Sequence, residues 1–447
     1  MSKILPAKFI SKMPHIGVDS LSEIKSEKVK LLPYGNNSTT IYTPEAQNKI
    51  LFKIPAYANS FMNNEAGFLS FKVKTTGTDA TNKTLLGMGV PVFSRCVIKS
   101  AQGLIVSEEN NFHILNRLFT IHRESDGMLD EGVYDNGDIS LTAKKATFAT
   151  ALETGITYIL KFKSSIMATD LPYIPLFMCD SVGGSAFDIE LTLSRPSDCL
   201  LLQTGSASST MSYEITEPTL NLTILRMSPN LTAKYHSIAS NENEKIIIPF
   251  KTYRCHTSSL TTATKQQLSI HEMSTNIKKI WTVLTKTHNV IDSAQNLGFY
   301  GAVKDTDLVL ESYNYQVGNQ FIYNEPVNES TNNNNNVTLQ HVKDASFSHD
   351  KKTIFSQPES TTTLENCFES NSKKMFHTVC GFDYSVESKH GVVQGISSST
   401  PIMVSITVDR NPQQYQMHNF CEIGYNLESM HGSIRYVEQK SGSNQVY

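Results

Sequence analysis

The chain has 447 residues, of which 39% are hydrophobic and 18% are charged, and its formal net charge is −3 at pH 7. A chain of this length is expected to fold into two or three domains with buried cores. The small net charge gives no electrostatic reason to expect strong direct binding to nucleic acid.

The cysteines and the hydropathy pattern narrow the class of protein further. Seven cysteines are scattered without a Cys-x-x-Cys spacing, which argues against a disulfide framework and against a zinc site. No apolar run approaches the roughly 18 residues of a membrane span. The start of the chain also lacks the apolar core of a signal peptide. We therefore expect a protein made in a reducing cytoplasm or nucleus.

Residues 1–46 are predicted to form an N-terminal arm, because they are polar, contain four prolines and show little periodicity. Up to Lys30 the arm holds six lysines against three acidic residues, a net charge of +3. This charge is small beside that of the basic tails that neutralise packaged RNA.

From residue 47 onward, short apolar segments separated by polar turns predict β-strands. The clearest is Phe187–Arg195, in which four apolar residues alternate with polar ones, as in a strand with one buried and one wet face. The other strands expected in the first half are 49–55, 68–74, 92–100, 156–166 and 218–227. Strands at this spacing indicate an all-β sandwich.

One helix is predicted among these strands, over residues 107–119. Ser107 can cap it, and Glu108 and Glu109 would lie in its positive first turn. Four apolar residues fall on one face of this helix.

The second half of the chain repeats the plan of the first. Ile402–Arg410 aligns with Phe187–Arg195 at an offset of 215 residues, and the four apolar positions coincide. We also align Lys245–Phe250 with Lys49–Pro55, since each has a lysine leading into an apolar run near a proline. The further strands expected in the second half are 267–273, 277–285, 307–318 and 433–439. Two related β-sandwiches in tandem account for these ordered matches.

Long loops separate some of these strands, at about 120–150, 324–337 and 345–395. Loops of this length are uncommon in compact domains and are usually functional or disordered. The asparagine run at 332–336 is interpreted as a solvated connector.

No catalytic constellation is found in the sequence. It contains no P-loop and no nucleophile elbow. The run at His271 begins like a zincin helix, but Thr275 stands where the second histidine ligand would be. His377 and Cys380 are interpreted as ordinary loop residues, and Trp281 as core packing. We predict no catalytic, cofactor-binding or metal-binding residues.

Four segments together carry a resemblance to a known family. They are 168–195, 213–231, 310–328 and 419–439. The first segment resembles the end of a first β-sandwich, or jelly roll, and the second resembles the strand that leads into a second one. The third resembles a tyrosine-containing strand that precedes a short helix, and the fourth resembles a final strand. The family is that of the double jelly-roll major capsid proteins of the adenovirus and tailless-phage lineage, especially the virophage, polinton-like virus and adintovirus forms. One departure is Asn324, which replaces a usual proline, and 338–347 fills the helix position.

The resemblance implies an all-β fold of two tandem eight-stranded jelly rolls, with an N-terminal arm and short helices in loops. The domains would be the arm at 1–46, the first roll at 47–228 and the second roll with a C-terminal tail at 229–447. The arm would face inward, and the loops at 120–150 and 345–395 would form exposed towers or intersubunit lacing.

The resemblance also implies a structural function without enzymatic activity or cofactors. The chain would form homotrimers, pseudo-hexagonal capsomers that tile an icosahedral shell around a double-stranded DNA genome. Its partners would be itself, neighbouring capsomers, and penton and minor or cement proteins. It would be located in the virion, after assembly in the host cytoplasm or nucleus.

Two other hypotheses for the function stay open. A penton or spike protein is usually one roll, so the duplication disfavours it. A carbohydrate-binding protein or glycosidase built of two sandwiches is disfavoured by the single tryptophan and the missing signal. The two catalytic carboxylates of a glycosidase can lie far apart in the sequence and meet only in the folded protein, so the sequence does not decide this point.

Overall fold

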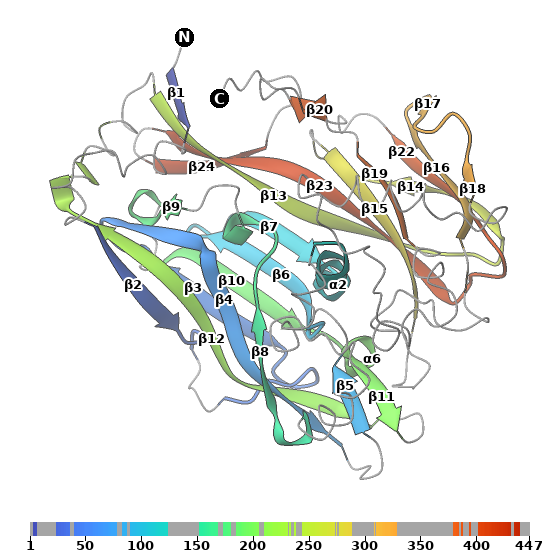
Figure 1. Ribbon diagram of the computed structural model, residues 1–447, viewed down its shortest axis with the longest axis horizontal. Helices are drawn as coiled ribbons and strands as arrows, with labels where there is room; N and C mark the ends of the chain where they lie inside the picture. Colours follow the sequence, from blue (N-terminus) through green and yellow to red (C-terminus); the bar gives the residue numbers. More distant parts are fainter. Residues whose placement is uncertain are drawn as a thin grey trace, which may run out of the picture.

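The structure is a computed structural model of the chain, and Figure 1 shows its arrangement. It describes residues 3–6, 24–35, 40–77, 83–86, 90–123, 152–168, 173–179, 185–204, 210–230, 232–233, 237, 244–272, 274, 277–287, 308, 310–328, 379–383, 386–387, 393–394, 401–430 and 433–438.

The first half contains eight main strands in two antiparallel sheets. They are β2 (Ile24–Leu31), β3 (Lys49–Pro55), β4 (Ser60–Thr76), β6 (Phe93–Ser100), β7 (Ile105–Asn110), β8 (Ile156–Leu160), β10 (Ser185–Leu193) and β12 (Ser212–Met227). One sheet has the order β3-β10-β6-β7, and the other has the order β2-β12-β4-β8. The two sheets bury their facing sides in one core.

The second half also contains eight main strands in two antiparallel sheets. They are β13 (Glu244–Ser259), β14 (Lys265–Ile270), β15 (Ile277–Lys286), β16 (Leu310–Val317), β17 (Gln320–Phe321), β19 (Val379–Asp383), β22 (Ile402–Val408) and β23 (Tyr415–Met430). Their sheet orders are β14-β22-β16-β17 and β13-β23-β15-β19.

The two halves match strand for strand in chain order. β2, β3, β4, β6, β7, β8, β10 and β12 correspond to β13, β14, β15, β16, β17, β19, β22 and β23, with the same neighbours in each sheet. The aligned strands β10 and β22 therefore hold the same position in their sheets. The prediction of two tandem eight-stranded rolls is confirmed, and Figure 1 shows the first roll in blue to green and the second in yellow-green to red.

The alternating sequence of β10 is explained by its two faces. Phe187, Ile189 and Leu191 are fully buried, and the residues between them are half-exposed. On the wet face the Glu190 carboxylate accepts hydrogen bonds of 2.9 Å from lysines on both neighbouring strands, β3 and β6. In β22 the same alternation buries Ile406 in a second core.

One of the predicted correspondences is wrong. Lys245–Phe250 lies in β13, whose counterpart is β2, and the counterpart of β3 is β14. A short apolar run indicates that a strand is buried, but the place of that strand in the sheet depends on the strands with which it pairs.

The arm predicted over residues 1–46 contains a strand of the first roll. Residues 24–31 form β2, which pairs with β12 over its whole length. Tyr42 is fully buried and exchanges two backbone hydrogen bonds with Ile215. The arm prediction is therefore wrong for these residues. Near the start of the chain β1 (Lys3–Pro6) pairs in parallel with β13, so it belongs to a sheet of the second roll.

The predicted helix begins later than expected. Helix α2 spans Phe112–Arg123, while Ser107, Glu108 and Glu109 lie in β7 and pair with β6. The backbone carbonyl of Asn111 accepts the first hydrogen bonds of the helix, from Ile114 and Leu115. Pairing with β6 outweighs the local capping signal, because it satisfies the backbone of these residues and buries part of the segment.

Shorter elements complete the described fold. They are β5 (Lys83–Leu86), β9 (Tyr173–Pro175), β11 (Leu200–Thr204), β18 (Val327–Asn328), β20 (Val386–Glu387), β21 (Val393–Gln394), β24 (Ser433–Glu438), α6 (Pro196–Cys199), η3 (Ile166–Ala168) and η4 (Leu176–Met178). The predicted loop at about 120–150 is wrong for residues 120–123, which belong to α2, and its remainder lies outside the described residues, as does the predicted helix at 338–347. The predicted loop at 345–395 is wrong where the chain forms β19, β20 and β21. None of the helices in the described part of the chain is long and apolar enough to cross a membrane.

We predict that Leu191→Ala and Ile406→Ala each lower the free energy of unfolding by about 2–5 kcal/mol, because each leaves a cavity in one of the two cores. Thr192→Ala, on the half-exposed face of β10, is the matched control and should change it by less than about 0.5 kcal/mol. Urea denaturation of the purified chain measures the three values. Equal stabilities for Leu191→Ala and Thr192→Ala would contradict the assignment of the buried face.

Candidate functional site

The most extensively built region is the junction between the two rolls. In Figure 1 the sheet that contains β13, β23 and β15 lies over the first roll, with α2 beside it. Strand β7 of the first roll lies close to β13 of the second. Residues of β13, β15 and β23 share one hydrophobic core with the first roll, while other residues of β15 and β23 line the separate core of the second roll.

Aromatic side chains form the centre of this junction. Phe119 of α2 contacts Tyr253 of β13 and Trp281 of β15 edge to face, with ring centroids 5.2 and 5.9 Å away. The Tyr253 and Trp281 rings are stacked at 6.2 Å. Trp281 is only 2% exposed, which confirms its prediction as a core residue. Such ring pairs add directional contacts to the burial of their area.

Polar contacts fix α2 and a nearby loop against β13. The Asn111 side-chain amide donates to Thr257 Oγ1 at 3.1 Å and lies 3.3 Å from Cys255 Sγ. The backbone N–H of Ser165 donates to the Lys251 carbonyl at 2.7 Å. Two segments of the first roll are thus hydrogen-bonded to one strand of the second.

A buried carboxylate lies in the same sheet. Glu422 of β23 accepts a hydrogen bond of 2.5 Å from the Tyr253 hydroxyl, and Lys251 Nζ lies 3.8 Å from its other oxygen. Burial raises the pKa of Glu422, but the charges of Lys251 and Lys279 and the Tyr253 hydrogen bond outweigh it, so the pKa is lowered. The group is therefore an anion held within the junction.

His418 of β23 lies between two neighbouring strands. Its Nδ1 is 3.0 Å from Thr257 Oγ1 on β13, and its Nε2 is 2.8 Å from Thr285 Oγ1 on β15. Burial lowers the pKa of His418 from 6.5 to about 4, because the charged imidazolium loses its hydration. The ring is therefore neutral at neutral pH and connects three strands.

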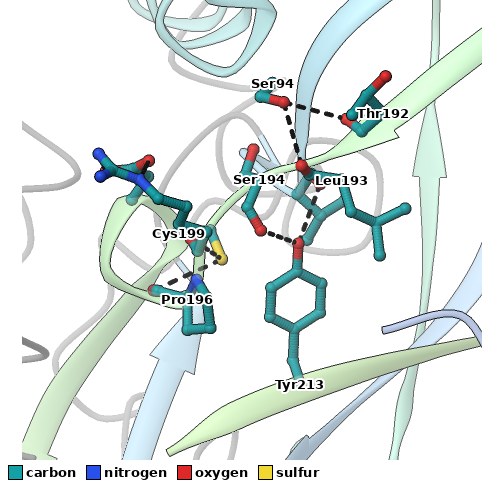
Figure 2. Close-up of polar contacts among 10 residues, drawn as sticks. Ser94, Thr192, Leu193, Ser194, Pro196, Cys199 and Tyr213 are labelled. Carbon is teal, nitrogen blue, oxygen red and sulfur yellow. Dashed lines mark hydrogen bonds and ion pairs between the residues drawn. The ribbon is translucent and has the colours of Figure 1, made fainter. Parts of the chain in front are cut away.

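A tyrosine at the start of β12 ties together the ends of the first roll. Figure 2 shows the Tyr213 side chain pointing at the chain segment that follows β10. Its hydroxyl donates toward the Ser194 carbonyl at 2.7 Å and the Val92 carbonyl at 3.1 Å. Ser94 Oγ donates to the Leu193 carbonyl at 3.0 Å beside it. Burial raises the pKa of Tyr213, so the hydroxyl keeps its proton for these bonds.

The second roll has a tyrosine at the corresponding place. Tyr415 begins β23, and its hydroxyl accepts a 3.2 Å hydrogen bond from the backbone N–H of Leu308. Val92 directly precedes β6, and Leu308 lies two residues before the start of the corresponding strand β16. Sequence reasoning missed both tyrosines, although each stands among the first residues of the last main strand of its roll.

One cluster of metal-binding residue types occurs in the described part of the chain. His256, Glu272 and Cys421 place their ligand atoms within 4.8 Å of one another. However, Glu272 Oε1 already accepts from Arg254 at 3.0 Å and from Ser274 at 2.7 Å, and Oε2 contacts His256 at 2.8 Å.

The charges of this cluster fit an ion-pair network. Burial raises the pKa of Glu272, but the hydrogen bonds of His256 and Ser274 and the charge of Arg254 bring it down to about 2. Burial raises the pKa of the Cys421 thiol, so it keeps its proton. A metal ion would have to displace an arginine and ionise a buried thiol, and the absence of a metal site stays our prediction.

Of the remaining residues singled out in the sequence, the structure describes only His271 and the backbone of Cys380. His271 is exposed just beyond β14, while Thr275 and His377 lie outside the described residues. Cys380 is in β19, but its side chain is outside the described set.

The fold is shared with viral capsid proteins of known structure. PBCV-1 VP54, fitted into a cryo-EM reconstruction of the virophage Sputnik, aligns with a TM-score of 0.57 at 9% identity, covering 92% of this chain and 96% of VP54. The Faustovirus major capsid protein aligns with a TM-score of 0.52 at 8% identity, covering 93% and 90%. A chain of the 3.5 Å cryo-EM structure of Sputnik gives 0.52 at 10% identity, covering 94% and 89%. This chain is a double jelly roll.

The likeness of this double jelly roll to those proteins lies in the fold, since the sequence identities are only 9%, 8% and 10%. No protein-family model and no curated protein matches the sequence. Chains of such different sequence can share a strand order, because many sequences satisfy the same pattern of burial.

We predict that Tyr213→Phe lowers the free energy of unfolding by about 1–3 kcal/mol, because two buried carbonyls of the first roll lose their donor. Tyr34→Phe, at a tyrosine that is 58% exposed, is the control and should leave stability unchanged. Thermal and urea unfolding of both variants measure the difference. A Tyr213→Phe variant as stable as the parent chain would show that the hydroxyl is not needed.

We predict that His418 makes the double jelly roll sensitive to acid. The pKa of His418 is about 4 in the folded chain and 6.5 for an ordinary histidine, so the unfolded chain takes up the proton first. The stability that comes from keeping His418 neutral is therefore fully present above pH 6.5 and is lost as the pH falls toward 4. The full effect is about 3 kcal/mol. His418→Gln should flatten the fall in unfolding free energy between pH 7 and about pH 4.5, a range above most carboxylate titrations.

The control for this experiment is His271→Gln, which changes an exposed histidine of the same roll. It should keep the pH dependence of the parent chain. If both variants retain the same slope, the acid sensitivity does not originate at His418.

Proposed function

We propose that this chain is the major capsid protein of a virus with an icosahedral shell and a double-stranded DNA genome. The observation that supports this most is the presence of two rolls of the same topology in one chain, joined by a buried junction. Three such chains supply six similar wedges, which make a pseudo-hexagonal tile with three-fold symmetry. Hexagonal tiles cover a surface without gaps.

The junction supports this role because a tile needs rolls in a fixed relation. The aromatic contacts of Phe119 and the hydrogen bonds of Asn111 join the first roll to β13 and β15 of the second. Rolls joined by a flexible linker would present variable edges to their neighbours. A dense interface presents one shape in every copy.

The proposal includes the partners and the location. The chain would contact other copies of itself within a capsomer, neighbouring capsomers, and penton and minor or cement proteins, and it would be found in the virion after assembly in the host cytoplasm or nucleus. The similarity of its fold to a chain of the PBCV-1 virus capsid and to the Faustovirus major capsid protein is consistent with this role. No catalytic activity or cofactor is assigned to the chain.

We also propose a boundary between the rolls at residues 228 and 229. These residues lie between β12, which ends at Met227, and β13, which begins at Glu244. The first roll then includes β2, so that an arm would precede residue 24.

We predict that the purified full-length chain is a trimer, with a mass three times its 49.8 kDa in light scattering. Negative-stain electron microscopy should show hexagonal outlines, because six rolls of similar shape surround the three-fold axis. A monomer, or an elongated dimer, would contradict the proposal. Hydrolysis of glycosides by the monomer would favour the two-sandwich glycosidase instead.

A further inference from the structure

His418 lies on the face of β23 that is turned toward the first roll. Successive side chains of a strand point to opposite faces of its sheet. Phe420 belongs to the core shared with the first roll, whereas Met417 and Cys421 line the separate core of the second roll. His418, two residues from Phe420, therefore shares its face, and Asn111 of the first roll meets the ring there. The imidazole belongs to the second roll but lies in the junction.

Asn111 is the residue of the first roll that reaches this ring. It stands between β7 and α2 with a left-handed backbone, at a φ of 53°, which asparagine adopts more readily than most residues. Its side-chain amide donates to Thr257 Oγ1 at 3.1 Å and lies 3.4 Å from His418 Nδ1. One amide group thus contacts two strands of the second roll, β13 and β23.

These contacts decide which nitrogen of His418 carries the hydrogen. Thr257 Oγ1 accepts from Asn111, so it can donate its own hydrogen to Nδ1, 3.0 Å away. Both groups beside Nδ1 are then donors, which makes Nδ1 the unprotonated nitrogen. Nε2 carries the hydrogen and donates it to Thr285 Oγ1 at 2.8 Å. A further proton must go to Nδ1, the nitrogen next to Asn111.

A proton on Nδ1 opposes this arrangement. It sets the N–H of a positively charged ring against the N–H of the Asn111 amide, at the positive end of α2. The ring is only 3% exposed, and a buried cation without a counter-ion needs water. Because the ring faces the first roll, water reaches it when the junction parts, and the core of the second roll can stay closed.

The carboxylates of the neighbouring elements have partners of their own. Glu422 of β23 accepts from the Tyr253 hydroxyl. Glu109 of β7 accepts from Ser164 Oγ. In the described part of the chain, His418 has hydrogen bonds to neutral groups and no ion pair. The other charged or titratable side chains on these elements include Lys251 and Cys255 on β13, Lys279 on β15 and His113 on α2.

We propose that His418 is an acid-sensitive switch of the junction, in which proton uptake at Nδ1 displaces Asn111 and loosens the first roll from β13 and β23. Each roll stays folded. The closed junction keeps the pKa of His418 at about 4, while an opened, hydrated one restores the ordinary value of 6.5. The ratio of opened to closed chains should therefore rise about 50-fold between pH 7 and pH 4.5. The inference concerns the single chain and goes beyond the proposed function.

The test uses Trp281, which is the only tryptophan of the chain and lies in the junction, 2% exposed. The full-length chain is titrated from pH 7 to pH 4.5, and acrylamide quenching of Trp281 fluorescence and far-UV circular dichroism are measured on the same samples. The quenching constant should rise at least threefold while the circular dichroism stays constant. His418→Gln should abolish the rise, and His271→Gln, at an exposed histidine, should retain it.

Asn111→Asp separates a proton switch from a merely structural role of this contact. Aspartate also tolerates the left-handed backbone and caps a helix well. Its carboxylate would, however, pair with the protonated ring inside the closed junction. The quenching constant of this variant should therefore stay low down to pH 4.5.

Each contrary outcome overturns a stated part of the inference. If Trp281 of the parent chain stays shielded until the circular dichroism falls, acid unfolds the chain without first loosening the junction, and the switch is wrong. An equal rise in His418→Gln assigns the response to another group. A rise in Asn111→Asp that equals that of the parent chain removes Asn111 from the switch. These measurements do not depend on trimer formation, so their failure leaves the proposed function intact.

Discussion

The constraint on which the structure depends is that one sheet is buried on both faces. Phe420 and Trp281 pack into the core shared with the first roll, while Met417 and Cys421 line the core of the second. Residues 417–423 of β23 are consecutively buried, although three of them are polar. This stretch of β23 has no wet side, so each polar group on it needs a partner within the protein.

The partners of these polar groups show how the constraint is met. His418 lies between threonines of two neighbouring strands, and Glu422 accepts from a tyrosine hydroxyl near a lysine. Asn419 Oδ1 accepts from Thr282 Oγ1 at 2.7 Å. Each of these bonds joins β23 to a neighbour, so a slip of one residue in register would break all of them. Buried polar contacts of this kind favour one arrangement over its near alternatives, and they make the junction sensitive to proton uptake at His418.

The duplication gives one topology two different tasks. In the second roll the sheet around β23 meets the first roll across an interface rich in aromatic residues. In the first roll the corresponding sheet around β12 carries lysines on β2 and a hydrogen-bonded polar face, as in the bond between Asn221 and Ser70. An interface formed once, within a chain, gains from being apolar and permanent. A surface that stays in contact with water must remain soluble, which favours charged and polar groups.

The sequence by itself determined the all-β class, the tandem duplication and the faces of the most regular strands. The alternation in Phe187–Arg195 and Ile402–Arg410 follows directly from burial on one side, so it can be read without knowing any neighbour. Only the tertiary structure decided that residues 24–31 form a strand, that Ser107–Glu109 belong to β7, and that Tyr213 and Tyr415 secure the ends of the rolls. Their environment is created by strands far away in the chain. A residue whose partners are distant carries no local periodic signal, because its neighbours in sequence are not its neighbours in the fold.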